Sequence, residues 1–189
     1  MIKSIKTLKE LNKKANRMVN RVIDDEGLEV ISMKVLNDDN FLSPYSTEYD
    51  EIISDEVATY LEHVITPIDL KHELHLVISS NCITEEEKEI YKKAIKNYYK
   101  DKVIDSARKI HINSIQSFWM LLTGIVIMIA YFILQFFFDT PFLEVMDIAT
   151  WVFVWEAVDL FFIERKILKI QQLRDTKLFN AKVSYRDLK

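Results

Sequence analysis

The chain has 189 residues and a net charge of −4, which gives no overall basic excess for binding nucleic acid. Its single cysteine, Cys82, excludes an internal disulfide framework and fits a reducing compartment. Its two glycines, Gly27 and Gly124, are too few for a glycine-rich phosphate loop. We therefore expect no nucleic acid partner and no cofactor.

Residues 1–23 predict a basic amphipathic helix, because apolar residues recur at three- and four-residue steps between basic ones. One interpretation is a helix lying on an anionic membrane surface, where each basic residue contributes about 1 kcal/mol. The other is a solvated helix that packs its apolar face on the rest of the chain. The basic residues in question are Lys3, Lys6, Lys9, Lys13, Lys14, Arg17 and Arg21.

Residues 24–113 predict a small cytosolic α+β domain. Alternating apolar residues indicate strands over 31–35 and 74–78, and an apolar stripe after Ser54 or Asp50 indicates a helix ending near residue 65. Two strands make a marginal sheet, so pairing of strands between subunits is an option.

Thr84 and Glu87 form a capping box that opens a further helix. Neither glycine nor proline interrupts the chain between Thr84 and Thr123, so we expect one long helix that continues into an apolar segment. The tail, residues 165–189, begins as a helix, and its last dozen residues are expected to be loosely structured.

Residues 114–164 predict a transmembrane hairpin with spans at 117–138 and 142–163. The first span contains no charged residue, and as a helix it would reach about 33 Å, enough to cross a hydrocarbon layer of ~30 Å. Residues 139–141 form a polar break. The predicted fold class is therefore two transmembrane helices joined by a long helix to the cytosolic α+β domain.

Charge on either side of the spans predicts the orientation. Basic residues such as Lys109 precede the first span and others such as Arg165 follow the second, while the connecting loop has acids and no base. The positive-inside rule places both termini of this multi-pass chain in the cytoplasm and the short loop outside.

Glu156 and Asp159 lie within the second span, where an ionised acid such as Asp costs roughly 2.5 to 3.5 kcal/mol at the helix centre. In an antiparallel hairpin they reach the depth of Gln116 and Thr123, and Gly124 would allow close approach of the helices. The four polar residues form either a seam that holds an oligomer together or an ion or proton site. Alternatively, the acids extend toward cytosolic water and Arg165.

No catalytic or metal-binding set is apparent. The segment His72-Glu73-Leu74-His75 differs from the zinc-protease motif HExxH, because one residue too few separates the histidines and the segment reads as a strand. The sequence offers no pair of nucleophile and base. We therefore expect a protein that is not an enzyme and binds no metal.

Three motifs carry a resemblance to a known group: Leu42-Ser43-Pro44-Tyr45-Ser46, Asp55-Glu56-Val57-Ala58-x-Tyr60-Leu61 and Trp155-x-x-x-Asp159-x-Phe161. Together they resemble small bacterial two-span membrane proteins with a cytosolic α/β domain. The resemblance implies a bacterial plasma-membrane protein and carries over no functional residues.

Two functions follow as expectations. The first is a non-enzymatic, membrane-anchored interaction or regulatory module that forms homo-oligomers through its hairpin and binds a cytosolic protein. The second is an oligomeric channel or membrane-perturbing effector that uses the intramembrane acids.

Overall fold

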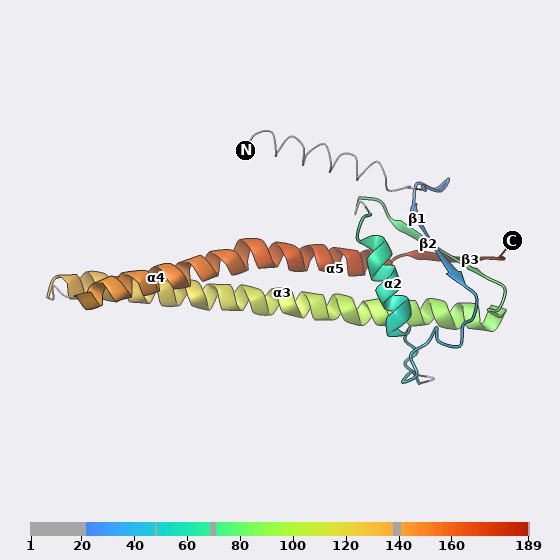
Figure 1. Cartoon of the computed structure of the whole chain (residues 1–189), viewed down its shortest axis with the longest axis horizontal. Helices are drawn as coiled ribbons and strands as arrows, with labels where there is room; N and C mark the ends of the chain where they lie inside the picture. Colours follow the sequence, from blue (N-terminus) through green and yellow to red (C-terminus); the bar gives the residue numbers. More distant parts are fainter. Residues whose placement is uncertain (1–21, 48, 69–70, 138–140, 189) are drawn as a thin grey trace. The chain divides into compact units, whose positions relative to one another are not determined.

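The computed structural model describes residues 22–47, 49–68, 71–137 and 141–188. The basic residues from Lys3 to Arg21, and nearly all of the helix expected over 1–23, lie outside this range. The described elements are β1 (Glu29–Val35), α2 (Asp55–Ile65), β2 (Leu74–Ser80), α3 (Glu85–Gln135), α4 (Pro141–Asp159), the π-helical turn η1 (Leu160–Glu164), α5 (Arg165–Phe179) and β3 (Lys182–Arg186) (Figure 1). The chain divides into two compact units, residues 1–102 with 173–189 and residues 103–172.

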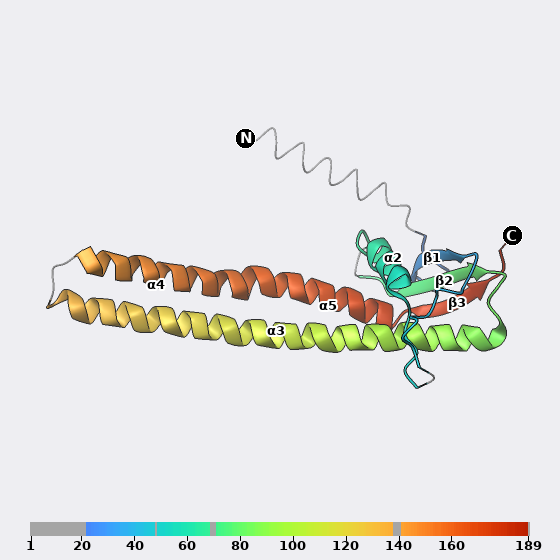
Figure 2. The same cartoon turned by 60° about the horizontal axis from the view of Figure 1, so that its bottom comes forward.

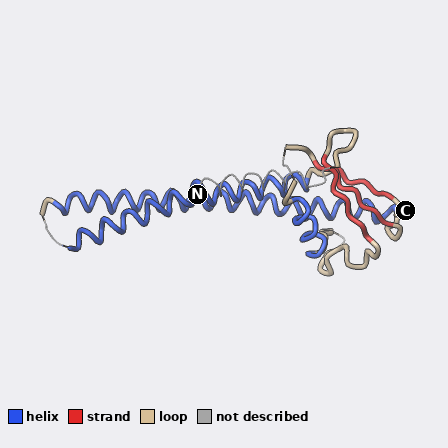
Figure 3. Tube along the Cα trace, turned by 45° about the horizontal axis from the view of Figure 1, so that its top comes forward, coloured by secondary structure: helices blue, strands red, loops and turns tan. Residues whose placement is uncertain are grey.

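The first unit contains a sheet of three parallel strands in the order β1-β2-β3 (Figures 2 and 3). The first two strands and α2 confirm the elements predicted from apolar periodicity. The expectation of a loosely structured C-terminal end is wrong, because residues 182–186 form β3 beside β2. The sheet therefore has a third strand from its own chain.

Helices cover one face of this sheet. Alternate residues of the strands, such as Ile31 and Leu76, enter a core with Leu61 of α2, Tyr99 of α3 and Leu178 of α5. Strand order follows chain order, so crossover connections of one hand bring these helices to the same face. The opposite face of the sheet contributes no residue to this core.

Helix starts follow the predicted capping. The Ser54 side chain accepts from the backbone N–H of Val57 at the start of α2. Thr84 and Glu87 form the capping box of α3. The Glu87 carboxylate accepts from the backbone N–H of Thr84 at 2.7 Å, and the Thr84 hydroxyl oxygen accepts from the backbone N–H of Glu87 at 3.4 Å. From there α3 runs uninterrupted to Gln135, as the absence of glycine and proline over its first part predicts.

Side chains fasten β3 to the rest of its unit. The Tyr185 hydroxyl donates to the backbone carbonyl of Lys88, and burial raises the pKa of this phenol, so it remains a donor. The Asn81 amide pairs with the backbone of Leu188, accepting from its N–H at 2.8 Å. The C-terminal strand is thus held along its length and at its end.

The second unit pairs α3 with α4 and η1. The Ser117 hydroxyl donates to the carbonyl of Ala157 at 2.9 Å, and the Asn113 amide donates to Glu164 at 3.0 Å. Gly124 lies where a Cβ atom would meet Cγ2 of Val154 at 3.0 Å, which confirms the expected close approach. Among the described helices, α3 is the one whose length and composition would allow it to cross a membrane.

Candidate functional site

The face of the sheet opposite the core presents a small grid of side chains, which we call the open face. Side chains alternate along a strand, and the register aligns the three strands, so each row holds one residue from each strand. The rows are Val30, His75 and Lys182; Ser32, Val77 and Ser184; and Lys34, Ser79 and Arg186.

Three residues that are far apart in the sequence form a continuous hydrogen-bonded chain on the open face. Nδ1 of His75 lies 2.6 Å from Oδ2 of Asp24, in the turn before β1. Nε2 of His75 lies 2.7 Å from Oγ of Ser184, on β3. The His75 and Asp24 side chains are 16% and 18% exposed, so these hydrogen-bonded side chains are largely buried and still accessible to solvent. The sequence offers no pair of nucleophile and base, and the structure places a histidine ring nitrogen within hydrogen-bond distance of a serine hydroxyl at this site.

The turn that carries Asp24 fixes its carboxylate. Oδ1 accepts from the backbone N–H of Leu28 at 2.9 Å and of Glu26 at 3.0 Å, while Oδ2 is left for His75. Desolvation acts to raise the pKa of Asp24, and the hydrogen bonds from Leu28, His75 and Glu26 together outweigh it and lower that pKa. The side chain is therefore an anion aimed at the imidazole.

Three basic residues lie on the open face around Asp24, His75 and Ser184, and they differ in whether they form an ion pair. Nζ of Lys182 contacts both carboxylate oxygens of Glu26 at 2.6 and 2.7 Å. Arg186 and Lys34 are exposed and, within the described part of the chain, have no ion-pair partner. Arg186 follows Ser184 by two residues and so stands beside it on the same face.

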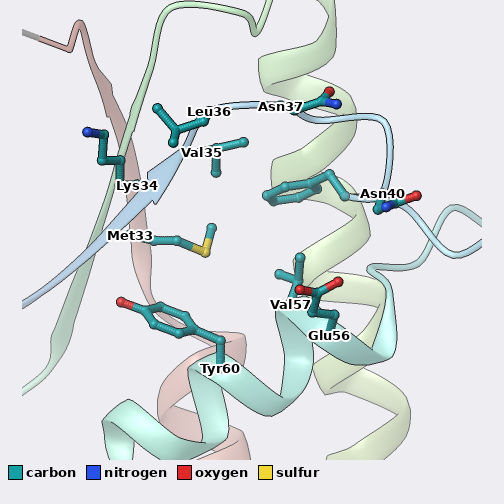
Figure 4. A pocket seen from close by; sticks show the side chains of 10 residues that line it. Met33, Lys34, Val35, Leu36, Asn37, Asn40, Glu56, Val57 and Tyr60 are labelled. Atoms are coloured by element: carbon teal, nitrogen blue, oxygen red, sulfur yellow. The ribbon is translucent and has the colours of Figure 1, made fainter.

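A groove lies at the other side of the same unit, between the outer edge of β1 and α2. It encloses about 510 Å³ and is lined by Met33–Asn37, Asn40, Phe41, Glu56, Val57 and Tyr60. In Figure 4, Met33 points toward Val57 and Tyr60 of α2, whereas Lys34 points away from them.

Backbone groups at the edge of β1 face this groove. The N–H of Glu29 donates toward β2, so alternate residues, including Ser32 and Lys34, direct their backbone groups outward. The Tyr60 hydroxyl donates to the Ser32 carbonyl at 2.9 Å. Near the N-terminal end of β1, the carbonyl of Val22 accepts from the N–H of Val30 in an antiparallel bridge on the same edge. This edge can therefore accept an added antiparallel strand.

The predicted intramembrane residues belong to the second unit. Gln116, Thr123 and Glu156 are exposed on its surface, and Asp159 is half-buried. The contacts within the helix pair come instead from smaller residues, including Ser117, Gly124 and Ala157. A hollow of about 430 Å³ lies beside them, lined by Ser114, Ser117, Phe118, Leu121, Ala157, Val158, Phe161 and Phe162.

The pattern that would have revealed Ser184 is present in the sequence. Residues 182–186 alternate polar and apolar residues, with Val183 and Tyr185 turned toward the core, which is the signature of a half-buried strand. Asp24 belongs to a short turn, and its neighbours in the sequence do not indicate a contact with His75. Among the described residues, no group of three or more His, Cys, Asp or Glu side chains is arranged to hold a metal ion.

Comparison with known proteins adds no further constraint on this site. No protein-family model matches the chain, and neither the curated proteins nor the solved structures contain a significant match.

Proposed function

We propose that this protein is a membrane-anchored interaction module whose cytosolic α/β unit binds an extended segment of a partner protein. The anchor is a two-span hairpin, α3 followed by α4 and η1, in a bacterial plasma membrane with both termini in the cytoplasm. Support for the second span comes from the contacts between α3 and α4 and from the exposed apolar residues of α4, including Trp151 and Trp155.

The groove between β1 and α2 is the observation that carries the binding function. Strand addition to a sheet edge derives affinity from main-chain hydrogen bonds and specificity from pockets for alternate side chains. The edge offers the N–H of Ser32 and the backbone groups of Lys34, and the groove offers an apolar floor at Met33 and Val57. The matching ligand is an extended chain with an apolar side chain at the position that faces Val57.

Self-assembly through the hairpin is the second part of the proposal. Gln116, Thr123 and Glu156 lie on exposed faces of the helix pair. The Thr123 hydroxyl donates to the carbonyl of Trp119 within α3, whereas in a lipid bilayer hydrogen bonds to a second copy would cost Gln116 and Glu156 less free energy than contact with hydrocarbon. Clustering would multiply the cytosolic grooves, so a multivalent partner would bind more tightly than a single segment.

Peptide selection tests the binding function. The full chain in lipid nanodiscs is panned against a displayed library of random peptides, and the selected peptide is synthesised and titrated. We expect the bound peptide to slow hydrogen exchange at the amides of Ser32 and Lys34. Val57→Arg, which fills the groove with a charge, should weaken binding at least tenfold, whereas Thr59→Arg, on an exposed part of α2, should not.

Two results would contradict this function. One is that no selected peptide changes exchange at Ser32 and Lys34. The other is that these amides are already protected in the absence of peptide, which would mean that the residues before Val22 or a second copy occupy the edge.

A further inference from the structure

The geometry points to a second activity: Ser184 is a nucleophile activated by His75 and Asp24, able to take an acyl group from a carboxylic ester. This site lies on the open face and is distinct from the groove at β1. It goes beyond a binding function, and its failure would leave the proposed binding function untouched.

The three side chains have the connectivity that nucleophilic catalysis by serine requires. Serine is a weak nucleophile until a base accepts its proton, and a third group orients that base. Here Nε2 of His75 is 2.7 Å from the Ser184 hydroxyl, and Nδ1 is 2.6 Å from Asp24. Because the Asp24 carboxylate accepts from Nδ1–H, the Nε2 lone pair is free to accept the serine proton.

The surroundings fix each role. Backbone N–H groups of Glu26 and Leu28 hold the second oxygen of Asp24, so the carboxylate cannot turn away from the imidazole. His75 and Ser184 stand on adjacent strands whose register is set by the sheet. All three groups are thus positioned by backbone, as a preorganised site requires.

Arg186 supplies positive charge where negative charge would develop. It lies two residues beyond Ser184 on the same face, is exposed, and has no ion-pair partner among the described residues. We assign it to stabilising the oxyanion of the tetrahedral intermediate.

The reaction balances with water as the second reactant. Oγ of Ser184 bonds to the ester carbonyl carbon while its proton passes to Nε2 of His75. The carbon–oxygen bond to the alcohol then breaks, and the alcohol leaves with that proton. Water, deprotonated by His75, attacks the acyl-serine, and the carboxylic acid and free Ser184 are regenerated.

A purely structural role would use the same contacts. The chain of hydrogen bonds would then only fasten the turn at Asp24 to β3, and Ser184 would be no more reactive than Ser32 in the same row of the grid. Reactivity, rather than stability, separates the two roles.

The test is labelling by a fluorophosphonate, which forms a stable adduct with activated serines. The full chain in nanodiscs is treated with a neutral fluorophosphonate, and the intact mass and modified peptide are measured. We expect one adduct, on Ser184, which Ser184→Ala abolishes and Ser79→Ala, on the open face of β2, does not. Asp24→Asn and His75→Asn should slow labelling by about 10²- to 10⁴-fold.

Two further variants test the assignment of Arg186. Arg186→Gln should slow hydrolysis of p-nitrophenyl acetate by about 10²-fold, whereas Lys96→Gln, at an exposed position of α3, should leave the rate unchanged. The proposal is overturned if Ser184 is not labelled, if Ser32 is labelled equally, or if His75→Asn reacts at the parent rate while the protein remains folded by circular dichroism.

Discussion

Oδ2 of Asp24 lies 2.6 Å from Nδ1 of His75, which ties the turn before β1 to the middle strand of the sheet. Asp24 also accepts from two backbone N–H groups of its own turn. One carboxylate therefore joins local turn structure to a contact across 51 residues of chain.

This link makes stability depend on pH in acid. Hydrogen bonds lower the pKa of folded Asp24 below its ordinary value near 3.8, so the folded state binds its proton less readily than the unfolded chain. The stabilisation is fully present above about pH 4 and is lost as pH falls through the lower folded value. Thermal unfolding in detergent between pH 6 and 3 should show a larger loss for the parent than for Asp24→Asn. Equal losses would contradict this role.

The C-terminal residues are part of the core rather than a loose tail. Leu178 is 1% exposed and Leu173, on the same helix, is 44% exposed. Leu178→Ala should lower the free energy of unfolding by about 2 to 5 kcal/mol, because it leaves a cavity. Leu173→Ala is the matched control and should cost much less. Urea unfolding followed by circular dichroism measures both, and equal costs would refute the packing of α5 in the core.

Gly124 allows α3 and α4 to approach within the second unit. A methyl group there would meet Cγ2 of Val154 at 3.0 Å, so Gly124→Ala should destabilise the helix pair by about 1 to 3 kcal/mol. Val154→Ala removes the opposing atom and should recover part of that loss in the double variant. A double-mutant cycle in micelles gives the coupling. Strictly additive effects would mean that the two residues do not touch.

The proposed self-assembly gives Glu156 and Asp159 a role that can be tested. If Glu156 and Asp159 contact another copy, replacing both by Leu should reduce the subunit number measured by native mass spectrometry. Replacing them by Gln and Asn should preserve assembly, because amides still form contacts of about 0.6 to 2 kcal/mol. An unchanged subunit number in the Leu variant would eliminate the seam. Cation current from the parent in planar bilayers, lost in the amide variant, would favour a channel instead.

Sequence patterns predicted the elements whose signals are local. Apolar alternation over β1 and β2, the Ser54 cap and the Thr84–Glu87 box each involve neighbours in the chain, and the structure contains all of them. α3 ends at Gln135, three residues before the predicted end of the first span at 138.

β3 and the contact between His75 and Ser184 were not predicted, because both depend on pairing between distant parts of the chain. β3 is short, and it becomes a strand because β2 offers it a partner more than a hundred residues away. Its alternation was readable, but so short a run also fits a polar tail. The contact between His75 and Ser184 exists only because β3 pairs with β2, and no local pattern in the sequence encodes that pairing. Tertiary context, rather than propensity, created the candidate site.

Labelling of single cysteines most directly tests whether the chain crosses the membrane twice and keeps the sheet unit in the cytoplasm. In a Cys82→Ser background, cysteine is introduced by Thr140→Cys in the predicted outer loop or by Asn180→Cys beside β3, where Asn180 is exposed. On intact cells, an impermeant maleimide should react with the first variant, and with the second only after permeabilisation. Reaction of the Asn180→Cys variant on intact cells would contradict the placement of the sheet unit in the cytoplasm. If the Thr140→Cys variant reacts as well, the chain does not cross twice; if it does not react, the two-span hairpin lies in the opposite orientation.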